Sequence, residues 1–246
     1  MRESLIFSEH YAESVNLSDG QQIRLRLVLP SDKRSMQRAF TELSASSRHK
    51  RFFAAKASLS EADLRYFTET DGYDHFAIVA VELDESGKEG KGLGIARSIR
   101  LPGDVACAEV AITVIDRMQG QGIGHLLLER LVDAALERGI ARFRFECLAH
   151  NQEMQGLISK VCRIIDTRHD GEVLIAETDL PGSRSTTNLQ TQETLFNLYT
   201  LLRAWTIQSV DMQMDLGKAT MNQTIGATHR NMDLLSALRQ SLPFQS

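Results

Sequence analysis

The sequence predicts a mixed α/β fold of the α+β type, with helices flanking a mostly antiparallel central sheet. Three observations predict it: two apolar strand-like stretches joined by a charged turn, a strand that runs into a glycine-rich turn and then a helix, and a late hairpin signal at Asp170-Gly171. The chain has 246 residues, 42% hydrophobic and 24% charged, which is enough to bury a full-sized core.

The first predicted elements are a strand followed by two helices. Leucine or isoleucine occupies every second position from Ile23 to Leu29, which predicts a half-buried strand over residues 21–29. Pro30-Ser31 then opens a helix that runs to about residue 43. The segment 60–63 resembles a capping box and opens a second helix to about residue 68.

Between these helices, residues 46–53 carry four basic groups beside two aromatic residues. Two interpretations are open. The favoured one is a solvated helix whose aromatic pair enters the core, and the alternative is a phosphate-facing patch.

The centre of the sheet is predicted by residues 75–83 and 93–100, which form an antiparallel hairpin, and by a third strand over 106–115. That strand leads into the glycine turn. The helix after it spans 126–138 and ends at Gly139, a typical helix C-terminal residue.

The remaining predicted elements are a strand at 141–148, a helix at 151–161 and a hairpin over 163–178. The composition changes after residue 180, so we expect one domain over 1–180 and a helical C-terminal extension over 181–246. The apolar stripes of that extension need a partner surface, so they either pack on the domain or form a homodimer.

Charge and composition exclude several classes of protein. A net charge of −4 and the lack of any polybasic run argue against nucleic acid as a partner. The opening residues do not resemble a signal peptide and the apolar runs are too short for a bilayer, so we expect a cytoplasmic protein without membrane attachment.

Cysteine and histidine patterns give no sign of a disulfide or a metal site. Cys107, Cys147 and Cys162 form no CxxC pair and have strand-like apolar neighbours, so we expect buried reduced thiols. The seven histidines show no ligand spacing, and we predict no metal.

The glycine-rich turn over residues 119–124 is the feature that points to function. A turn between a strand and a helix presents backbone N–H groups that lack intrahelical partners, at the positive end of the helix dipole. Glycines let phosphate oxygens approach these amides closely, which predicts an anion site. The turn lacks the Lys-Ser/Thr ending of a P-loop, and its GxGxG spacing differs from the GxGxxG of a Rossmann fold.

The stretch from Arg117 to Gly122 instead resembles the Arg/Gln-x-x-Gly-x-Gly/Ala motif of the GNAT acetyltransferase superfamily. The resemblance covers about residues 17–178, and it is closest to the bacterial protein lysine acetyltransferase (Pat-type) branch. Further similar segments lie at 17–20, 47–53, 59–61, 108–111 and 148–154.

The resemblance implies a GNAT-like sheet, acetyl-CoA as cofactor, and transfer of the acetyl group to a primary amine. In this family the turn amides hold the pyrophosphate, the preceding strand pairs with the pantetheine arm, and an Asn at the start of the next helix contacts the cofactor. The implied cofactor-binding residues are Ile112, Thr113, Val114, Ile115, Arg117, Gln119, Gly120, Gln121, Gly122, Ile123, Gly124, His125, Asn151 and Met154.

Glu109 is the candidate general base. An alkylammonium must lose a proton before its nitrogen can attack a thioester, and a carboxylate in an apolar strand can accept that proton. A surface-facing residue or a core ion pair is the alternative for Glu109, and the resemblance favours the base. A backbone N–H near residues 112–114 is expected to meet the developing oxyanion.

The chain departs from many relatives where a tyrosine often protonates the CoA thiolate, because Ile158 stands at that position. Three functions therefore stay open. The favoured one is acetylation of protein lysine, and the others are acetylation of a small-molecule amine and a non-catalytic regulator that senses acetyl-CoA.

Overall fold

The structure is a computed structural model that describes residues 5–181 of the chain. Within that part it contains five α-helices and eight strands. The helices are α1 (Lys33–Thr41), α2 (Ala45–Phe52), α3 (Glu61–Thr68), α4 (Ile123–Glu137) and α5 (Gln152–Val161). The strands are β1 (Ala12–Asn16), β2 (Gln22–Leu27), β3 (His75–Leu83), β4 (Glu89–Leu101), β5 (Asp104–Val114), β6 (Arg142–Leu148), β7 (Arg163–Asp170) and β8 (Val173–Asp179).

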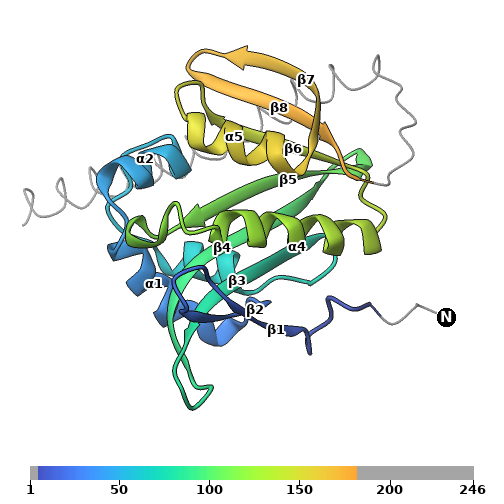
Figure 1. The fold of residues 1–246 in the computed structure, drawn as a ribbon. Coiled ribbons are helices and arrows are strands. Elements are labelled where there is room, and N and C mark those ends of the chain that lie inside the picture. The colour runs from blue at the N-terminus through green and yellow to red at the C-terminus, as the bar shows by residue number, and fades with distance from the viewer. Residues whose placement is uncertain (1–4, 182–246) are drawn as a thin grey trace, which may run out of the picture. The chain divides into compact units, whose positions relative to one another are not determined.

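The eight strands form one sheet in the order β1-β2-β3-β4-β5-β6-β8-β7 (Figure 1). Every neighbouring pair is antiparallel except β5 and β6, which are parallel and are joined through α4. This arrangement confirms the predicted mixed, mostly antiparallel sheet with flanking helices.

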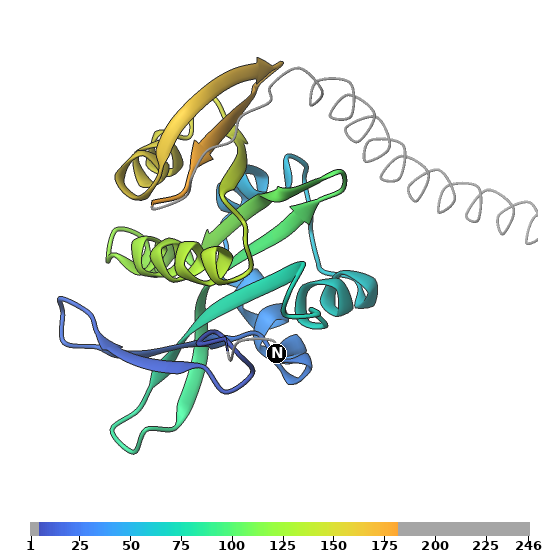
Figure 2. The same cartoon turned by 90° about the vertical axis from the view of Figure 1, so that its right-hand side faces the viewer.

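The helices cover both faces of the sheet. Helix α4 lies across one face, and α1, α2 and α3 lie on the other side (Figures 1 and 2). Leu127, Leu128 and Leu131 of α4 are fully buried in the main core, because an apolar side chain at every third or fourth position gives the helix one continuous apolar face.

Most predicted elements are found close to their expected bounds. Ser60 and Asp63 form the expected capping box, with Asp63 N donating to Ser60 Oγ at 3.1 Å and Ser60 N donating to Asp63 Oδ2 at 2.7 Å. The basic stretch lies in α2, and its partly buried Phe52 packs against the core with its ring 5.8 Å from the Phe40 ring. Phe53 is also partly buried but ends the helix in a left-handed conformation, so the expected packing of an aromatic pair holds for Phe52 alone. Helix α4 begins at Ile123, three residues before its predicted start.

The structure tests the prediction for the cysteines but not the one for the C-terminal extension. Cys107, Cys147 and Cys162 are all buried and carry free thiols, as predicted. None of the helices in residues 5–181 is long and apolar enough to cross a lipid bilayer. The expected helical extension over 181–246, with its packing or dimer role, lies outside the described residues apart from Pro181 at its start.

Strand β1, which was not predicted, is attached to α4 by an ion pair. Arg130 of α4 donates two hydrogen bonds to Glu13 of β1, from Nε to Oε2 at 2.7 Å and from Nη2 to Oε1 at 2.8 Å. The hydroxyl of Tyr11 donates to the same carboxylate at 2.8 Å. These bonds fix the outer edge of the sheet to the helix that follows the glycine turn.

Replacing Glu13→Gln is expected to lower the free energy of unfolding by about 1 kcal/mol at neutral pH, the scale of a bidentate but partly exposed ion pair. The hydrogen bond from Arg130 holds the pKa of Glu13 below its usual value. Its stabilisation is therefore present above the unfolded-state pKa of about 4.3 and is lost as the pH falls through the lower folded-state pKa.

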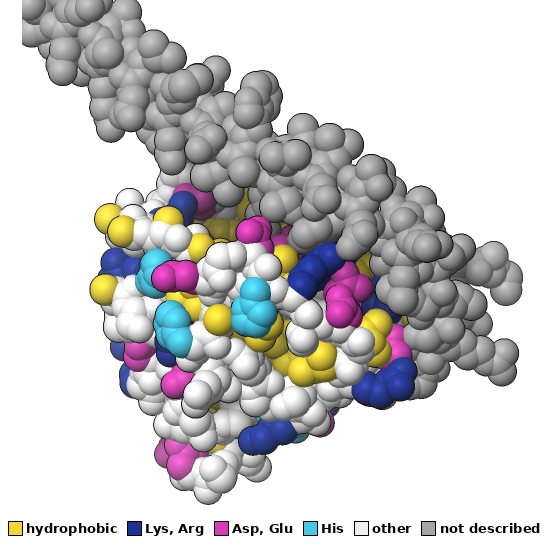
Figure 3. Space-filling model, turned by 90° about the horizontal axis from the view of Figure 1, so that it is seen from above, with side chains coloured by type: hydrophobic (Ala, Val, Ile, Leu, Met, Phe, Trp, Pro, Cys, Tyr) yellow, Lys and Arg dark blue, Asp and Glu magenta, His cyan; other side chains and the backbone are white. Residues whose placement is uncertain are grey.

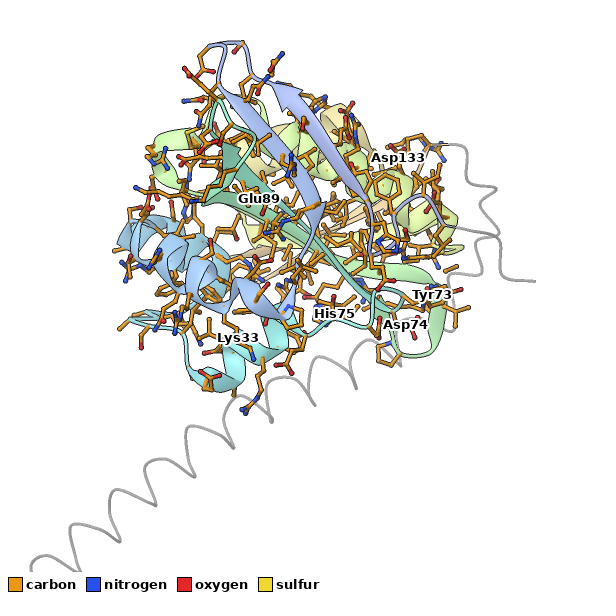
Figure 4. The ribbon with its side chains drawn as sticks, turned by 90° about the horizontal axis from the view of Figure 1, so that it is seen from below. Lys33, Tyr73, Asp74, His75, Glu89 and Asp133 are labelled. Carbon is orange, nitrogen blue, oxygen red and sulfur yellow. The ribbon has the colours of Figure 1, made fainter. Side chains whose placement is uncertain are left out.

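Urea denaturation between pH 7 and pH 3 measures the free energy of unfolding of this variant and of the wild type. The difference between the two values should become smaller toward pH 3. Asp133→Asn on the exposed side of the same helix (Figure 4) is the matched control and should leave the midpoint unchanged. Equal effects of the two variants would contradict the assigned role of Glu13.

Candidate active site

The parallel strands β5 and β6 diverge toward their C-terminal ends. They pair only from Cys107 to Val110 and from Arg142 to Phe145, although β5 continues to Val114 and β6 to Leu148. Beyond the paired part, β5 stays on β4 and β6 stays on β8. A gap with an unpaired backbone edge therefore opens in the middle of the sheet.

The peptide groups of Ile112 face this gap. Ile115 N donates to Leu93 O at 2.9 Å on the β4 side, whereas Ala106 O accepts from Ala141 N at 2.8 Å on the β6 side. Peptide groups alternate in direction along a strand, so those of the even-numbered residues of β5 point away from β4. The N–H of Ile112 thus lies at the open edge, where the expected oxyanion donor is needed.

The glycine turn follows β5 directly and begins with the 3-10 turn η2 (Asp116–Met118). Gly120 and Gly122 have φ values of 77° and 86°, a left-handed conformation that disfavours any residue with a Cβ atom. A Cβ atom built on either glycine would meet no heavy atom within 4 Å, so the space in front of the turn is open. Gly122 is the N-cap of α4.

Backbone N–H groups gather at the start of α4. From Gly120 to His125, six consecutive N–H groups have no hydrogen-bond acceptor among the described residues. They lie at the positive end of the α4 dipole, which makes this turn an anion site of the kind that binds phosphate. Ile123 is fully buried and anchors the turn to the core.

The third glycine, Gly124, has a different role from the first two. Its φ is not positive, and a Cβ atom there would lie 3.4 Å from Cδ2 of Leu157 in α5. A methyl group there would make an ordinary van der Waals contact with α5, so neither the conformation of the turn nor the packing requires a glycine at this position.

Side chains around the turn brace its backbone. Gln119 donates from Nε2 to Val114 O at 3.0 Å, and Gln121 donates to Arg117 O at 3.4 Å. Oε1 of Gln121 is buried and has no hydrogen-bond partner among the described residues. Arg117 pairs with Glu82 at 2.8 Å and with Glu42 at 3.2 Å, so contact with a cofactor would have to compete with two ion pairs.

The start of α5 lies on the β6 side of the gap. Asn151, which is 9% exposed, caps this helix by accepting from Met154 N at 3.3 Å, and Met154 packs against the core. Ile158 is 1% exposed, so the position where relatives carry a tyrosine is filled by a core side chain.

Glu109 lies on β5 in its paired part and is half-buried. In register it lies opposite Ile99 of β4 and Arg144 of β6. Arg144 in turn donates to Glu177 of β8 at 2.6 Å, and both of these residues are buried. The carboxylate of Glu109 is thus part of a charged row on the sheet face opposite α4.

Asp116 connects the glycine turn to α2, a contact that was not predicted. Its carboxylate accepts from Ser44 N at 2.9 Å, from Ser44 Oγ at 2.7 Å and from Ser47 Oγ at 2.9 Å. Burial raises the pKa of Asp116, but these hydrogen bonds outweigh it and lower the pKa below its usual value. In the sequence, Ser44 lies just before the stretch 46–53 and Ser47 lies within it, which gives no local signal of this contact.

The surface seen from above carries charges of both signs, interspersed with uncharged atoms (Figure 3). Among the described residues visible in that view, the lysine and arginine side chains do not gather into one broad patch.

Comparison with known proteins identifies the class to which this fold and site belong. Residues 39–162, half of the chain, match the sequence model of the Acetyltransferase (GNAT) family. The chain belongs to this family. This membership confirms the expected class, a GNAT acetyltransferase with acetyl-CoA as its cofactor.

Two curated relatives are similar in sequence. The acetyltransferase Pat of Mycolicibacterium smegmatis is 32% identical over 167 residues, which cover 68% of this chain and 48% of Pat. The chain therefore spans about half the length of Pat. An acetyltransferase of Pseudomonas aeruginosa is 30% identical over 149 residues, covering 61% of this chain and 77% of that protein.

Solved structures of other acetyltransferases resemble this fold. The GNAT domain of S. lividans PAT has a TM-score of 0.62 at 28% identity, over 71% of this chain and 99% of that domain. The structure of yncA from Salmonella typhimurium with its cofactor acetyl-CoA has a TM-score of 0.53 at 15% identity, over 67% of this chain and 96% of that one, which is a likeness of fold alone.

Replacing Gly122→Ala should both destabilise the protein and weaken CoA binding, because an alanine with φ near 86° costs about 1–2 kcal/mol and shifts the amides of the turn. Gly124→Ala is the matched control, since its φ is not positive and its new methyl group makes ordinary van der Waals contacts, with Leu157 Cδ2 at 3.4 Å and Val114 Cγ2 at 3.8 Å.

Urea denaturation and calorimetric titration with CoA measure the two effects. We expect the Gly122 variant to lose stability and affinity, and the Gly124 variant to keep its stability. Equal losses of stability would mean that the left-handed conformation is not what selects glycine in this turn.

Proposed function

We propose that this protein transfers the acetyl group of acetyl-CoA to a primary amine, with protein lysine as the acceptor. The observation that carries the proposal is the meeting of three features: the six unpaired N–H groups from Gly120 to His125, the gap between β5 and β6, and Glu109 on the strand that borders the gap. The turn suits the pyrophosphate, and the gap suits an extended arm that hydrogen-bonds to the free edge of β5.

With CoA placed in the turn and the gap, the other predicted cofactor-binding residues lie around it. Ile112 offers its peptide groups at the open edge to the pantetheine arm, and Val114 O, which also faces the gap, accepts from Gln119 Nε2. The peptide groups of Thr113 point to β4, so Thr113 would contact the arm through its side chain, and the buried Ile115 fixes the strand end. His125 lies in the first turn of α4. Across the gap, Asn151 caps α5 and Met154 lies in the first turn of that helix.

In the proposed reaction the neutral amine attacks the thioester carbon directly. Glu109 removes the proton from the ammonium group, either directly or through a water molecule. The N–H of Ile112 donates to the oxyanion of the tetrahedral intermediate. The C–S bond then breaks and CoA leaves as a thiolate, which with a pKa of about 8.5 can depart without a general acid at the position of Ile158.

Glu109→Gln is expected to lower kcat by about 10²–10⁴-fold, the usual contribution of a general base, while leaving the affinity for acetyl-CoA unchanged. Measuring CoA release and calorimetric binding separates these two quantities. Glu172→Gln, in the exposed turn between β7 and β8, removes one carboxylate elsewhere and should change neither. Unchanged turnover in the Glu109 variant would remove this residue from the base role.

The similarity to Pat of Mycolicibacterium smegmatis and to the GNAT domain of S. lividans PAT supports protein lysine as the acceptor. A small-molecule amine is the second candidate. Incubation of the chain and acetyl-CoA with a panel of folded proteins and small amines, followed by mass spectrometry and CoA release, distinguishes them. Acetylation of small amines alone would overturn the protein-directed proposal.

A non-catalytic sensor of acetyl-CoA is the third candidate, and the observation that favours it is the buried Ile158 in place of tyrosine. Robust multiple-turnover acetylation of any amine would exclude it. Tight CoA binding without turnover in the same panel would support it.

Location and assembly are also proposals. Three buried free thiols support a reducing, cytoplasmic location. The proposed homodimer through residues 181–246 is tested by comparing the solution mass of the full chain with that of a chain lacking residues 183–246.

A further inference from the structure

An open cleft lies between the helices α1–α3 and the face of the sheet opposite α4, with about 750 Å³ of empty space that includes solvent at its mouth. Its lining is mostly apolar, with aromatic rings from all three helices and valines from β3. The main apolar residues are Met36, Phe40, Phe52, Phe67, Val79 and Val81.

Arg97 of β4 also lines this cleft and is only 4% exposed. Its Nη1 lies 2.7 Å from Nε2 of His75, its Nη2 donates to Phe67 O at 2.9 Å, and its guanidinium stacks 4.7 Å over the Phe67 ring. His75 stands at the start of β3, after Tyr73 and Asp74 (Figure 4).

The neighbours of Arg97 do not neutralise its charge. Burial, and then repulsion from Arg97, lower the pKa of His75 to about 4, so this imidazole is neutral at pH 7 and accepts the hydrogen bond. No carboxylate of residues 5–181 forms an ion pair with Arg97. Asp32, the carboxylate in the cleft lining, is held by Arg26 through two hydrogen bonds of 2.8 Å.

A second guanidinium adds to the positive charge. Arg51 of α2 lines the same cleft. Burial, and then the charge of Arg51, lower the pKa of Arg97 to about 9, so Arg97 is still protonated at pH 7 but at a cost in free energy. An anion that enters the cleft offsets this cost, since a buried charge is stable only when it is paired.

We propose that the cleft beneath α1–α3 binds a carboxylic acid with an apolar body, whose carboxylate pairs with Arg97 and whose aryl or alkyl part lies among the aromatic side chains. Guanidinium and carboxylate match in geometry as well as charge, and a mostly apolar pocket with a small number of polar or charged groups is the usual form of a small-molecule site.

The cleft lies on the same side of the sheet as the candidate base. Thr113 lines it and shares one face of β5 with Glu109, and Arg97 pairs in register with Ala111 between them. Only the identification of the ligand with the acetyl acceptor rests on the proposed function. Binding of the carboxylate does not.

Calorimetric titration of the full chain without acetyl-CoA tests the proposal, with 4-phenylbutyrate as the probe and uncharged 4-phenylbutanamide as its isosteric control. We expect the acid to bind at least about tenfold more tightly than the amide. Equal affinities, or no binding of either compound, would overturn the proposal.

Variants locate the site. Arg97→Gln should reduce the affinity for the acid to that for the amide and leave the amide unaffected. Should that variant fail to fold, Ser35→Trp gives the same information, because Ser35 lines the cleft from α1 and the indole ring fills it. Gln37→Trp, exposed on the same helix, is the matched control. Unaltered binding of the acid to the Ser35 variant would place the ligand elsewhere and overturn the proposal.

Kinetics distinguish the two sources of such a carboxylate. Inhibition by 4-phenylbutyrate that is competitive with the amine identifies the cleft as the site of the acceptor's own body, and non-competitive inhibition identifies a separate ligand. A protein that binds the acid but acetylates no amine would contradict the proposed function while leaving the carboxylate site intact.

Discussion

The divergence of β5 from β6 is the constraint on which the rest of this site depends. Each strand is held on its other side by an antiparallel partner, β4 or β8, and the two share only the short ladder that ends at Val110 and Phe145. The paired part positions Glu109 rigidly, while the unpaired part beyond it frees the peptide groups of Ile112. One break in a sheet thus supplies both a fixed carboxylate and a free donor, a few residues apart.

Much of this arrangement could be predicted because its signals are local. The glycine turn, the capping box at Ser60 and the hairpins each depend on a few neighbouring residues, and their elements were found near the expected positions. Strand β1 was missed because its five residues, Ala12–Asn16, have no apolar alternation of their own. Pairing with β2 and the bond from Arg130 supply the stability that the segment lacks by itself.

The burial of charged residues in the strands could not be predicted from the sequence either. Arg144 and Glu177 occur in strand-like segments where a charged residue is normally taken to face solvent, yet they are buried against each other. Whether one or both faces of a strand are covered depends on elements distant in the sequence. Arg97 did leave a signal, because it occupies a position between Ile95 and Ile99 that the strand pattern reserves for apolar residues.

The carboxylate of Asp116 connects the glycine turn to the cleft beneath α1–α3. It begins the turn that presents amides to an anion, and it also holds the N-terminus of α2, whose residues line the cleft on the other side of the sheet. A ligand that moves Asp116 changes the free energy of binding both at the turn and in the cleft. Thermodynamic linkage requires the two effects to be equal. Ligands at the turn and in the cleft, whichever they are, would then change each other's affinity by the same factor.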